Sequence, residues 1–149
     1  MSKAATQVPF ETTLFVHDTC LCLHMQRAAR ALARRFDEAF RPLGLTSGQY
    51  SMLMATNQPE PPTIGAIASI LSMDRTTITA ALKPLERRRL VAVMVDAGDR
   101  RSRRVKLTPA GRALLARAVP IWRRTHAEID RLLPDAGAGR LRRDLAALT

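Results

Sequence analysis

The segment from Asp74 to Pro109 limits what this chain can fold into more than any other part of the sequence. Its pattern predicts a helix, a β-hairpin and the start of a second helix. Between Arg75 and Lys106, a span of 32 residues, ten lysines or arginines face three acids, which gives a net charge of +7. A basic helix followed directly by a basic hairpin suits the grooves and phosphates of duplex DNA. The alternative, a solvated basic surface without a partner, is disfavoured because arginine dominates the cluster.

Length and composition agree with one basic domain. The chain has 149 residues, a net charge of +11 and 46% hydrophobic residues. The charge calls for a polyanionic partner, and nucleic acid ranks above an anionic membrane. No apolar run approaches the roughly 20 residues of a membrane span, and the first residues do not form a signal peptide, so we expect a cytoplasmic protein without a membrane partner. Cys20 and Cys22 cannot make a disulfide framework and are expected to be reduced thiols.

A helix-turn-helix is predicted within the lobe that spans residues 46–108. Thr46 and Gln49 form a capping box for a first short helix, Thr63 caps the next, and Asp74 caps the basic helix after a turn at 71–73. The inward face of the basic helix carries apolar residues at helical spacing: Ile78, Ala81, Leu82 and Leu85. The outward face carries short or basic side chains that can reach base edges and phosphates: Arg75, Thr76, Thr77, Thr79 and Lys83.

Two residues near the end of the basic helix break local rules. Pro84 removes one hydrogen bond, and we expect a kink rather than a stop because the apolar stripe continues past it. Arg89 occupies the position where a glycine would end a helix comfortably, so a left-handed backbone there should cost roughly 1 kcal/mol. Strands are then predicted at 91–95 and 103–107, joined by a charged turn, as a hairpin or wing.

Apolar stripes at both ends of the chain predict long helices outside the DNA-binding lobe. The first covers residues 11–40, and the last helices lie within 109–149 and bend or break at Pro120 and Pro134. Such stripes are too exposed for a lone small domain, which indicates packing on a second subunit. The expected fold class is mainly α with a small β-hairpin wing, as a winged helix-turn-helix flanked by N- and C-terminal dimerisation helices.

The chain resembles the MarR family of bacterial transcription regulators over essentially its whole length, residues 1–149. The resemblance is carried by the helix order and by the segments at 85–91, Asp99-Arg-Arg101 and Leu107-Thr-Pro-Ala-Gly111. It implies a homodimer that binds double-stranded DNA, with repression or activation relieved by a small ligand. We expect no cofactor and no metal. It also implies that Arg101 enters the minor groove, whose negative potential favours arginine, and that Asp99 helps to orient it. Arg89, where most relatives carry glycine, is the clearest departure.

The candidate DNA-binding residues therefore extend from the basic helix into the wing. Beyond the helix positions already given, they are the charged residues at the helix end and in the hairpin: Arg87, Arg88, Asp99, Arg100, Arg101 and Arg103. The family pocket usually takes aromatic or phenolic acids between the DNA-binding lobe and the dimer helices. By that resemblance the candidate effector-binding residues are His17, His24, Tyr50 and Trp122.

Cys20 and Cys22 leave three interpretations open. They can be small buried hydrophobic residues beside interface histidines. They can form a redox switch, because Cys22 lies eight residues before Arg30, the spacing of the reactive cysteine in the hydroperoxide-sensing branch of the family. Gln26 and Phe36 stand where that branch has tyrosines. His17, Cys20 and His24 can also share a helix face as zinc ligands, although no fourth ligand is visible. We expect both thiols at least two turns inside the first helix, and so poorly activated.

Two further classes of function compete with a regulator. A nonspecific DNA-binding protein would share the basic charge but show a low specificity ratio. A thiol enzyme would need more than a cysteine near a histidine, and no glycine-rich elbow, phosphate loop or paired-carboxylate motif is present. We therefore expect a sequence-specific regulator, a repressor rather than an enzyme, that an aromatic or phenolic ligand releases from a pseudo-palindromic operator.

Overall fold

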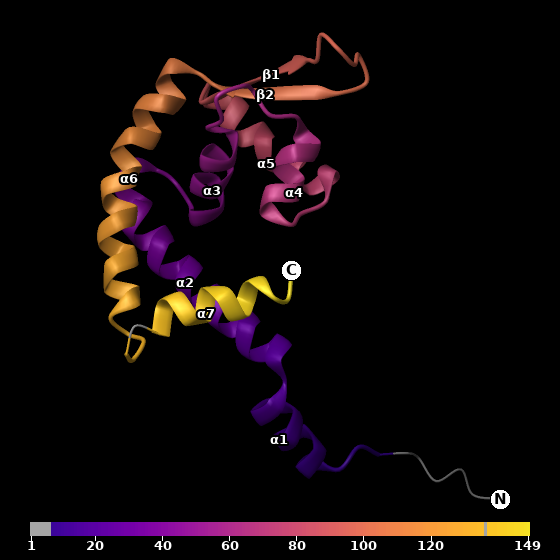
Figure 1. Cartoon of the computed structure of the whole chain (residues 1–149), viewed down its shortest axis with the longest axis vertical. Helices are drawn as coiled ribbons and strands as arrows, with labels where there is room; N and C mark the ends of the chain where they lie inside the picture. The colour runs from indigo at the N-terminus through magenta and orange to yellow at the C-terminus, as the bar shows by residue number, and fades with distance from the viewer. Residues whose placement is uncertain (1–6, 136) are drawn as a thin grey trace, which may run out of the picture.

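A computed structural model describes residues 7–135 and 137–149. Figure 1 shows a lobe made of α3, α4, α5 and a two-stranded hairpin, with the long helix α6 beside it and α2 running away from the lobe toward α1. The elements are α1 (Phe10–Thr19), α2 (Leu21–Phe40), the 3₁₀ turn η1 (Arg41–Leu43), α3 (Ser47–Thr56), α4 (Ile64–Leu71), α5 (Arg75–Arg87), β1 (Val91–Val95), β2 (Arg103–Leu107), α6 (Pro109–Asp130) and α7 (Gly137–Ala146). The predicted fold class, mainly helical with a small hairpin wing, is confirmed.

The three helices of the lobe and α6 after it start at side-chain caps, and three of these caps, at Thr46, Thr63 and Asp74, were predicted from the sequence. Thr46, Thr63, Asp74 and Thr108 each accept the amide three residues later, at 3.1, 3.1, 2.8 and 3.0 Å. Gln49 completes the capping box by accepting the amide of Thr46 at 3.2 Å. Each cap satisfies an amide that the helix itself leaves unpaired, and such caps stabilise a helix by about 1 kcal/mol.

The end of α5 and the start of α6 meet at one carbonyl. Arg89 takes the expected left-handed conformation, with φ of 55°, and the amide of Leu90 returns to the Leu85 carbonyl at 2.9 Å, which closes a Schellman motif. The Leu90 carbonyl then accepts the Thr108 amide at 3.0 Å. Gly111 packs so close that a β-carbon there would lie 2.0 Å from the Leu90 oxygen. Only glycine fits this crossing.

The prediction of a single helix at 11–40 is wrong, because the helix is interrupted at Cys20. Cys20 has φ of −72° and ψ of 106°, an extended conformation that ends α1 at Thr19. The Cys20 thiol accepts the amide of Leu23 at 3.5 Å and so acts as the N-cap of α2. The side-chain cap offers the backbone an alternative to a continuous helix, and neither proline nor glycine marks the place.

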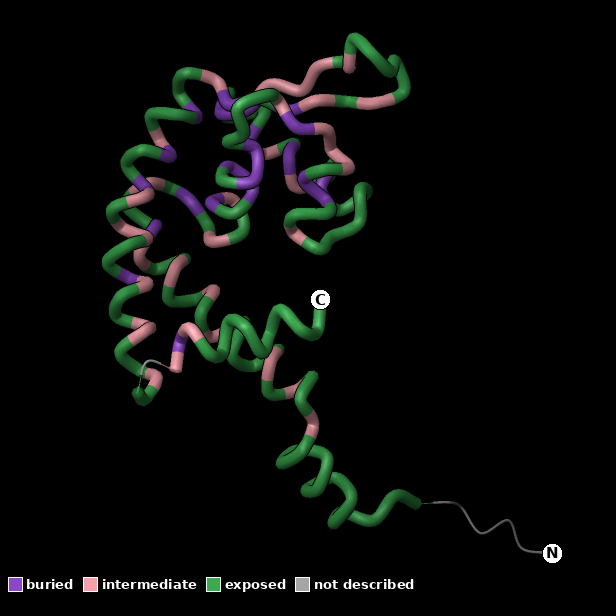
Figure 2. The backbone as a smooth tube through the Cα atoms, in the orientation of Figure 1, coloured by how far each residue is buried: buried purple, intermediate pink, exposed green. Residues whose placement is uncertain are grey.

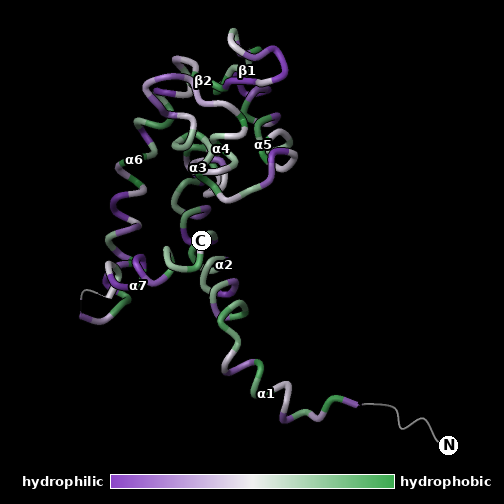
Figure 3. The backbone as a smooth tube through the Cα atoms, turned by 45° about the vertical axis from the view of Figure 1, so that its right-hand side comes forward, coloured by the Kyte–Doolittle hydropathy of each residue, from purple (hydrophilic) through white to green (hydrophobic). Residues whose placement is uncertain are grey.

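Burial divides the molecule into two parts. Figure 2 shows buried residues gathered in the lobe and along the facing side of α6, whereas α1 and most of α7 are exposed. The core is centred on Phe40, Leu53, Ile67 and Ile78, all 0% exposed. Figure 3 shows hydrophobic residues continuing along α1 and α2 outside that core. Among the described residues, no helix combines the length and the apolar character that a membrane crossing requires.

Candidate nucleic-acid interface

The outward face of α5 is built as the sequence predicted. Ile78, Leu82 and Leu85 are buried against the lobe, and the predicted contact residues of α5 are exposed. Asp74 fixes the helix start: hydrogen bonds from the Thr77 hydroxyl, at 2.5 Å, and from the Thr77 amide lower the pKa of the Asp74 carboxyl. The Thr77 hydroxyl is thus used inside the cap, whereas the Thr76 hydroxyl makes no hydrogen bond within residues 7–135 and 137–149. The first turn of a helix has unpaired amides that can bind a phosphate.

Two arginines of this face are engaged with the protein itself. The Arg75 guanidinium lies over α4, where a β-carbon on Gly65 would come within 2.9 Å of its Nη2 atom. Arg88 donates from Nη1 to the Gly44 carbonyl at 2.8 Å and from Nη2 to the Leu43 carbonyl at 3.5 Å. Arg88 therefore ties the end of α5 to η1, and its assignment as a DNA contact competes with this structural use.

The wing tip presents two arginines on a hydrogen-bonded turn. Asp99 accepts the backbone amide of Arg101 at 3.0 Å, and the Asp99 carbonyl accepts the Ser102 amide at 2.9 Å. Arg103 folds back and donates to the carbonyls of Arg100 and Ser102 at 3.2 and 3.3 Å. Within the described residues the guanidinium groups of Arg100 and Arg101 make no hydrogen bond, so these two are available for phosphates or a groove. Asp99 orders the backbone of Arg101 rather than its guanidinium.

Arg104 is a functional candidate that the sequence analysis did not single out. Its Nε atom lies 3.0 Å from Asp96 Oδ1, and this hydrogen-bonded pair lowers the pKa of Asp96 and raises that of Arg104. Its Nη1 atom donates to the Pro61 carbonyl at 2.7 Å. The Pro61 carbonyl lies 43 residues earlier in the sequence, so the sequence does not indicate this contact. The one available signal is the alternation of side chains along a strand, which places Arg104 on the face opposite to Arg103.

A pocket of about 510 Å³ lies between α3, α4 and α6. Tyr50 and Trp122 contribute its aromatic rings and Arg123 its cation, and Ile70 and Leu71 line it from α4. Burial raises the pKa of the Tyr50 hydroxyl, although the nearby Arg123 cation opposes this shift. Tyr50 also stacks on Phe40 with ring centroids 4.7 Å apart. An aromatic wall with one cation and one neutral hydroxyl can hold a planar organic anion.

The structure brings together only two of the four predicted effector residues. Tyr50 and Trp122 line this pocket, whereas His17 and His24 do not. His17 lies on α1, hydrogen-bonded to Asp18, and His24 bonds the Cys20 carbonyl at 2.9 Å. His17 belongs to α1 and His24 to the first turns of α2, and both of these segments lie away from the lobe (Figure 1). Arg123, beside Trp122 in the sequence, is the charged residue of the pocket, and the sequence analysis missed it.

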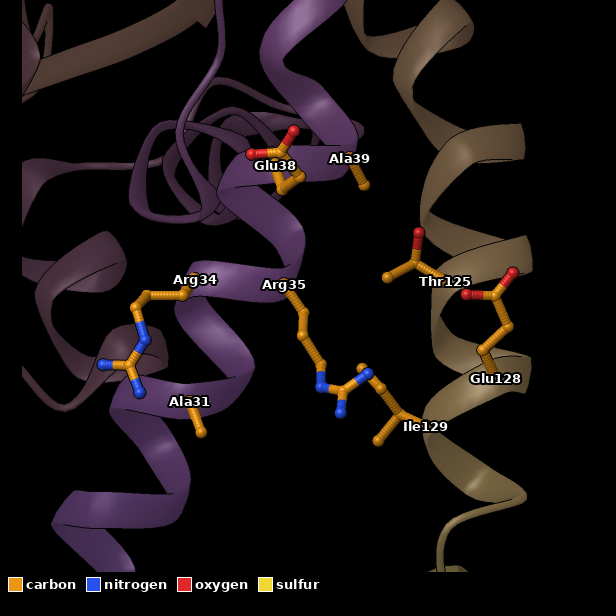
Figure 4. A pocket seen from close by; sticks show the side chains of 8 residues that line it. All are labelled: Ala31, Arg34, Arg35, Glu38, Ala39, Thr125, Glu128 and Ile129. Atoms are coloured by element: carbon orange, nitrogen blue, oxygen red, sulfur yellow. The ribbon is translucent and has the colours of Figure 1, made fainter.

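A second pocket, of about 620 Å³, lies between α2 and α6 and has a different character. Figure 4 shows Arg35 extending across toward α6, where Thr125, Glu128 and Ile129 face it, while Arg34 points away. Its lining mixes cations with Glu38 and Glu128 and includes no aromatic ring. This pocket is therefore a poorer match to an aromatic acid than the pocket at Tyr50.

The two thiols lie at the start of α2, not two turns inside a helix as expected. Cys20 is the N-cap and is partly buried, while the exposed Cys22 lies in the first turn. Gln26 donates to Cys22 Sγ at 3.0 Å, and Arg30 donates to the Gln26 side-chain oxygen at 3.2 Å. Across residues 7–135 and 137–149, no three His, Cys, Asp or Glu side chains gather as metal ligands, and the extended Cys20 separates His17 from His24.

Comparison with known proteins gives a consistent picture. Residues 43–102 match the model of the MarR family. The M. tuberculosis transcriptional regulator MosR, solved in complex with DNA, is 41% identical, with a TM-score of 0.79 over 87% of this chain and 92% of that chain. BpsR of Bordetella bronchiseptica, solved to explain regulation of its DNA binding by 6-hydroxynicotinic acid, is 25% identical, with a TM-score of 0.78 over 87% of this chain and 93% of that chain.

A curated relative is the transcriptional activatory protein BadR of Rhodopseudomonas palustris. It is 33% identical over 95 residues, which are 62% of this chain and 54% of BadR. This chain therefore spans about half the length of that relative.

Proposed function

The chain belongs to the MarR family, and on that premise we propose that it is a homodimeric, sequence-specific DNA-binding repressor that a small aromatic acid releases from its operator. The observation that carries the proposal is the pairing of an exposed basic helix face with two free arginines at the wing tip. Lys83 on α5 and Arg100 and Arg101 on the hairpin are exposed cations on one rigid lobe. A helix for the major groove and an arginine for the minor groove supply base readout and phosphate contact together.

Dimerisation is supported by apolar side chains that the protomer leaves exposed at its ends. In α1, Phe10 is 68% and Phe15 is 67% exposed, and Leu141 of α7 is 43% exposed. A second copy covering these faces would place two lobes side by side. The operator is then a pseudo-palindrome with half-sites about one helical turn, roughly 34 Å, apart.

Arg101→Ala tests the DNA-binding proposal. We expect it to weaken binding to a selected operator by about 1–3 kcal/mol while the protein stays folded, because a groove contact is lost. Arg140→Ala in α7 is the matched control, since it removes an exposed arginine far from the wing and should leave binding unchanged. If a dimer neutralises about eight phosphates, the log–log salt slope of the wild type should lie near −7. Equal affinity of Arg101→Ala and wild type at fixed salt contradicts the wing's role.

The pocket at Tyr50 supports an aromatic acid as the effector. Arg123 can pair with a carboxylate, and Trp122 offers a ring face to an aromatic ligand. A thermal-shift series of hydroxylated benzoic and nicotinic acids should raise the melting temperature of the wild type. Arg123→Gln should abolish the shift, whereas Arg35→Gln in the other pocket should preserve it. A shift that survives Arg123→Gln but is lost in Arg35→Gln moves the effector site to the pocket of Figure 4.

The Arg30–Gln26–Cys22 chain of hydrogen bonds supports a second candidate, a redox-sensing repressor. Gln26, which takes the place of a tyrosine, donates to the Cys22 sulfur and is itself bonded by an arginine. In this mechanism the Cys22 thiolate attacks the terminal oxygen of a hydroperoxide. The S–O bond forms as the O–O bond breaks, the alkoxide leaves with a proton as an alcohol, and Cys22 is oxidised by two electrons to a sulfenic acid.

A gel-shift assay with sub-millimolar hydroperoxide separates the two mechanisms. The redox mechanism requires that peroxide releases DNA from the wild type but not from Cys22→Ser, and that Gln26→Leu slows the release. If peroxide leaves DNA binding unchanged while an aromatic acid releases it, the thiols are structural and the ligand mechanism holds.

A further inference from the structure

We propose that Arg104 is a positioning residue that clamps the wing against the loop before α4 and so sets where Arg101 meets DNA. The proposal rests on the proposed DNA-binding function and adds to it a residue that acts without touching DNA. Arg104 belongs to the most basic stretch of the chain, yet its guanidinium is directed to protein groups on two sides.

The clamp joins three separate segments through one side chain. Arg104 stands on β2, donates to the Pro61 carbonyl at 2.7 Å, and pairs with Asp96, directly after β1, at 3.0 Å. A planar guanidinium can hold a carbonyl and a carboxylate at once because its donors point in fixed, divergent directions. A lysine in this position has one charged atom and cannot reproduce both contacts with the same geometry.

The backbone around Arg104 makes the same connection. Thr63 and Arg104 form an isolated antiparallel bridge, and the Val105 amide donates to the Pro62 carbonyl at 2.9 Å. Thr63 is also the N-cap of α4, through the Ala66 amide at 3.1 Å. The hairpin is therefore fastened to the first helix of the helix-turn-helix, and the clamp lies at the point of attachment.

Asp96 connects Arg104 to the turn at the wing tip. Its side chain is 14% exposed, and Oδ1 accepts the Gly98 amide at 3.1 Å as well as the Arg104 guanidinium. The Asp96 amide donates to the Ser102 carbonyl at 3.1 Å, which closes the turn that carries Arg101. Removing Arg104 leaves Asp96 without its cation, so the turn loses the contact that aligns it with the helices.

The charge of Arg104 is already neutralised, and this separates it from its neighbours. Arg100 and Arg101 carry guanidinium groups without a hydrogen bond among the described residues, whereas Arg104 is paired with Asp96. A phosphate contact releases a counterion and steepens the salt dependence of binding. A clamp makes no contact of its own with DNA, so it affects affinity and salt dependence only through the wing arginine that it positions.

The test is a double-mutant cycle between Arg104→Met and Arg101→Ala, on a duplex that the wild type selects from a random pool. We expect Arg104→Met to weaken binding about tenfold in the wild-type background but less than about twofold in the Arg101→Ala background, since the clamp serves the wing arginine. In the Arg101→Ala background, where the wing arginine is already absent, adding Arg104→Met should leave the salt slope unchanged. Lys106→Met, which removes a cation from the same face of β2, is the matched control for charge, and its effect should be the same in both backgrounds.

Asp96→Asn gives an independent check should Arg104→Met fold poorly, because the amide oxygen can still accept the Gly98 amide. The loss of affinity in Asp96→Asn should likewise depend on the presence of Arg101. In hydroxyl-radical footprints, either variant should lose protection of the minor groove at the flanks of the binding site and keep the protection at its centre. Equal losses of affinity in both backgrounds, or a slope reduced by about 0.9 when Arg104→Met is added to Arg101→Ala, would assign Arg104 to a phosphate and overturn the clamp. If the wild type selects no sequence from the random pool, the proposed function is contradicted. If the wild type binds a sequence specifically and Arg104→Met leaves that affinity unchanged, only the clamp is contradicted.

Discussion

The winged lobe and the terminal helices use the same kinds of apolar side chain but place them differently. In the lobe, Leu53, Ile67 and Ile78 are 0% exposed, whereas Leu14 of α1 and Leu21 of α2 are 48% and 68% exposed. Helix α1 has no buried residue, and α7 buries only Ala138 among those described. The lobe is therefore completed by its own chain, and the terminal helices have apolar faces that this chain leaves uncovered. An apolar stripe in a sequence locates a helix face but not the molecule that covers it.

The largest expected effect separates the two regions by stability. Leu53→Ala should lower the free energy of unfolding by about 2–5 kcal/mol, because it opens a cavity in a packed core. Leu145→Ala in α7, where the side chain is 38% exposed, should lower it by about 0.5 kcal/mol or less in the monomer. Urea unfolding over a dilution series measures both. Equal costs in the two variants would mean that the terminal helices are packed as tightly as the lobe.

The next effect concerns self-association. Leu14→Glu combined with Phe15→Glu should weaken the dimer by about 2 kcal/mol or more, since charges would replace apolar anchors at the interface. Val95→Glu is the matched control, because Val95 is similarly exposed, at 52%, but lies on the wing. Sedimentation at micromolar concentration should find a dimer for the wild type and for Val95→Glu. A wild type that sediments as a monomer would leave the exposed faces of α1 and α7 without an explanation.

A smaller effect tests strain inside the lobe. Arg89→Gly should stabilise the protein by about 0.5–1 kcal/mol, because relief of the left-handed conformation outweighs the added freedom of the unfolded glycine. Arg89→Ala keeps the strain and removes the charge, so it should not stabilise. Thermal unfolding compares the two variants. A gain of equal size in Arg89→Ala would assign the effect to charge rather than to backbone conformation.

The smallest effect is the pH dependence at the cap of α5. The Asp74 carboxyl has a pKa below its usual 3.8 because of its bonds from Thr77, so it contributes stability above that pH and loses it as the pH falls through the lowered value. Asp74→Asn keeps a cap oxygen without a titrating group. We expect this variant to lose less stability than the wild type between about pH 5 and pH 3, measured by urea unfolding. Parallel pH profiles would contradict a role for this carboxylate.

Local chemistry made much of the lobe predictable from the sequence. The caps at Thr63 and Asp74 and the left-handed Arg89 each depend on residues within a few positions of one another, and the hairpin at 91–107 pairs two strands that are adjacent in the sequence. The break at Cys20 was missed because the helical periodicity runs through it and a thiol is an uncommon cap. His17 lies on α1, at the end of α2 that is remote from the lobe, so it does not reach the pocket at which it was expected.

Contacts between distant segments could not be predicted in the same way. Arg88 and Arg104 belong to a basic cluster, and composition alone assigns both to DNA. Their partners are the carbonyls of Gly44 and Pro61, more than 40 residues earlier in the chain. A backbone carbonyl leaves no signal in a sequence, because every residue has one. Arg123 escaped notice for a related reason, since its importance depends on Tyr50 lying across the pocket.

The close crossing of Gly111 and the Leu90 carbonyl has a mechanical consequence. At that point α6 has no side chain to yield, and Thr108 bonds the same carbonyl, so the end of α5 and the start of α6 cannot slide past each other. Trp122 and Arg123 lie further along the same helix, about 17–18 Å from Gly111 at 1.5 Å per residue. Because this contact is tight, a tilt of α6 at the pocket should move the lobe with it, and we expect the lobe to rotate as one rigid body. Under the proposed function, an effector in this pocket would act by changing the separation of the two α5 helices in the dimer.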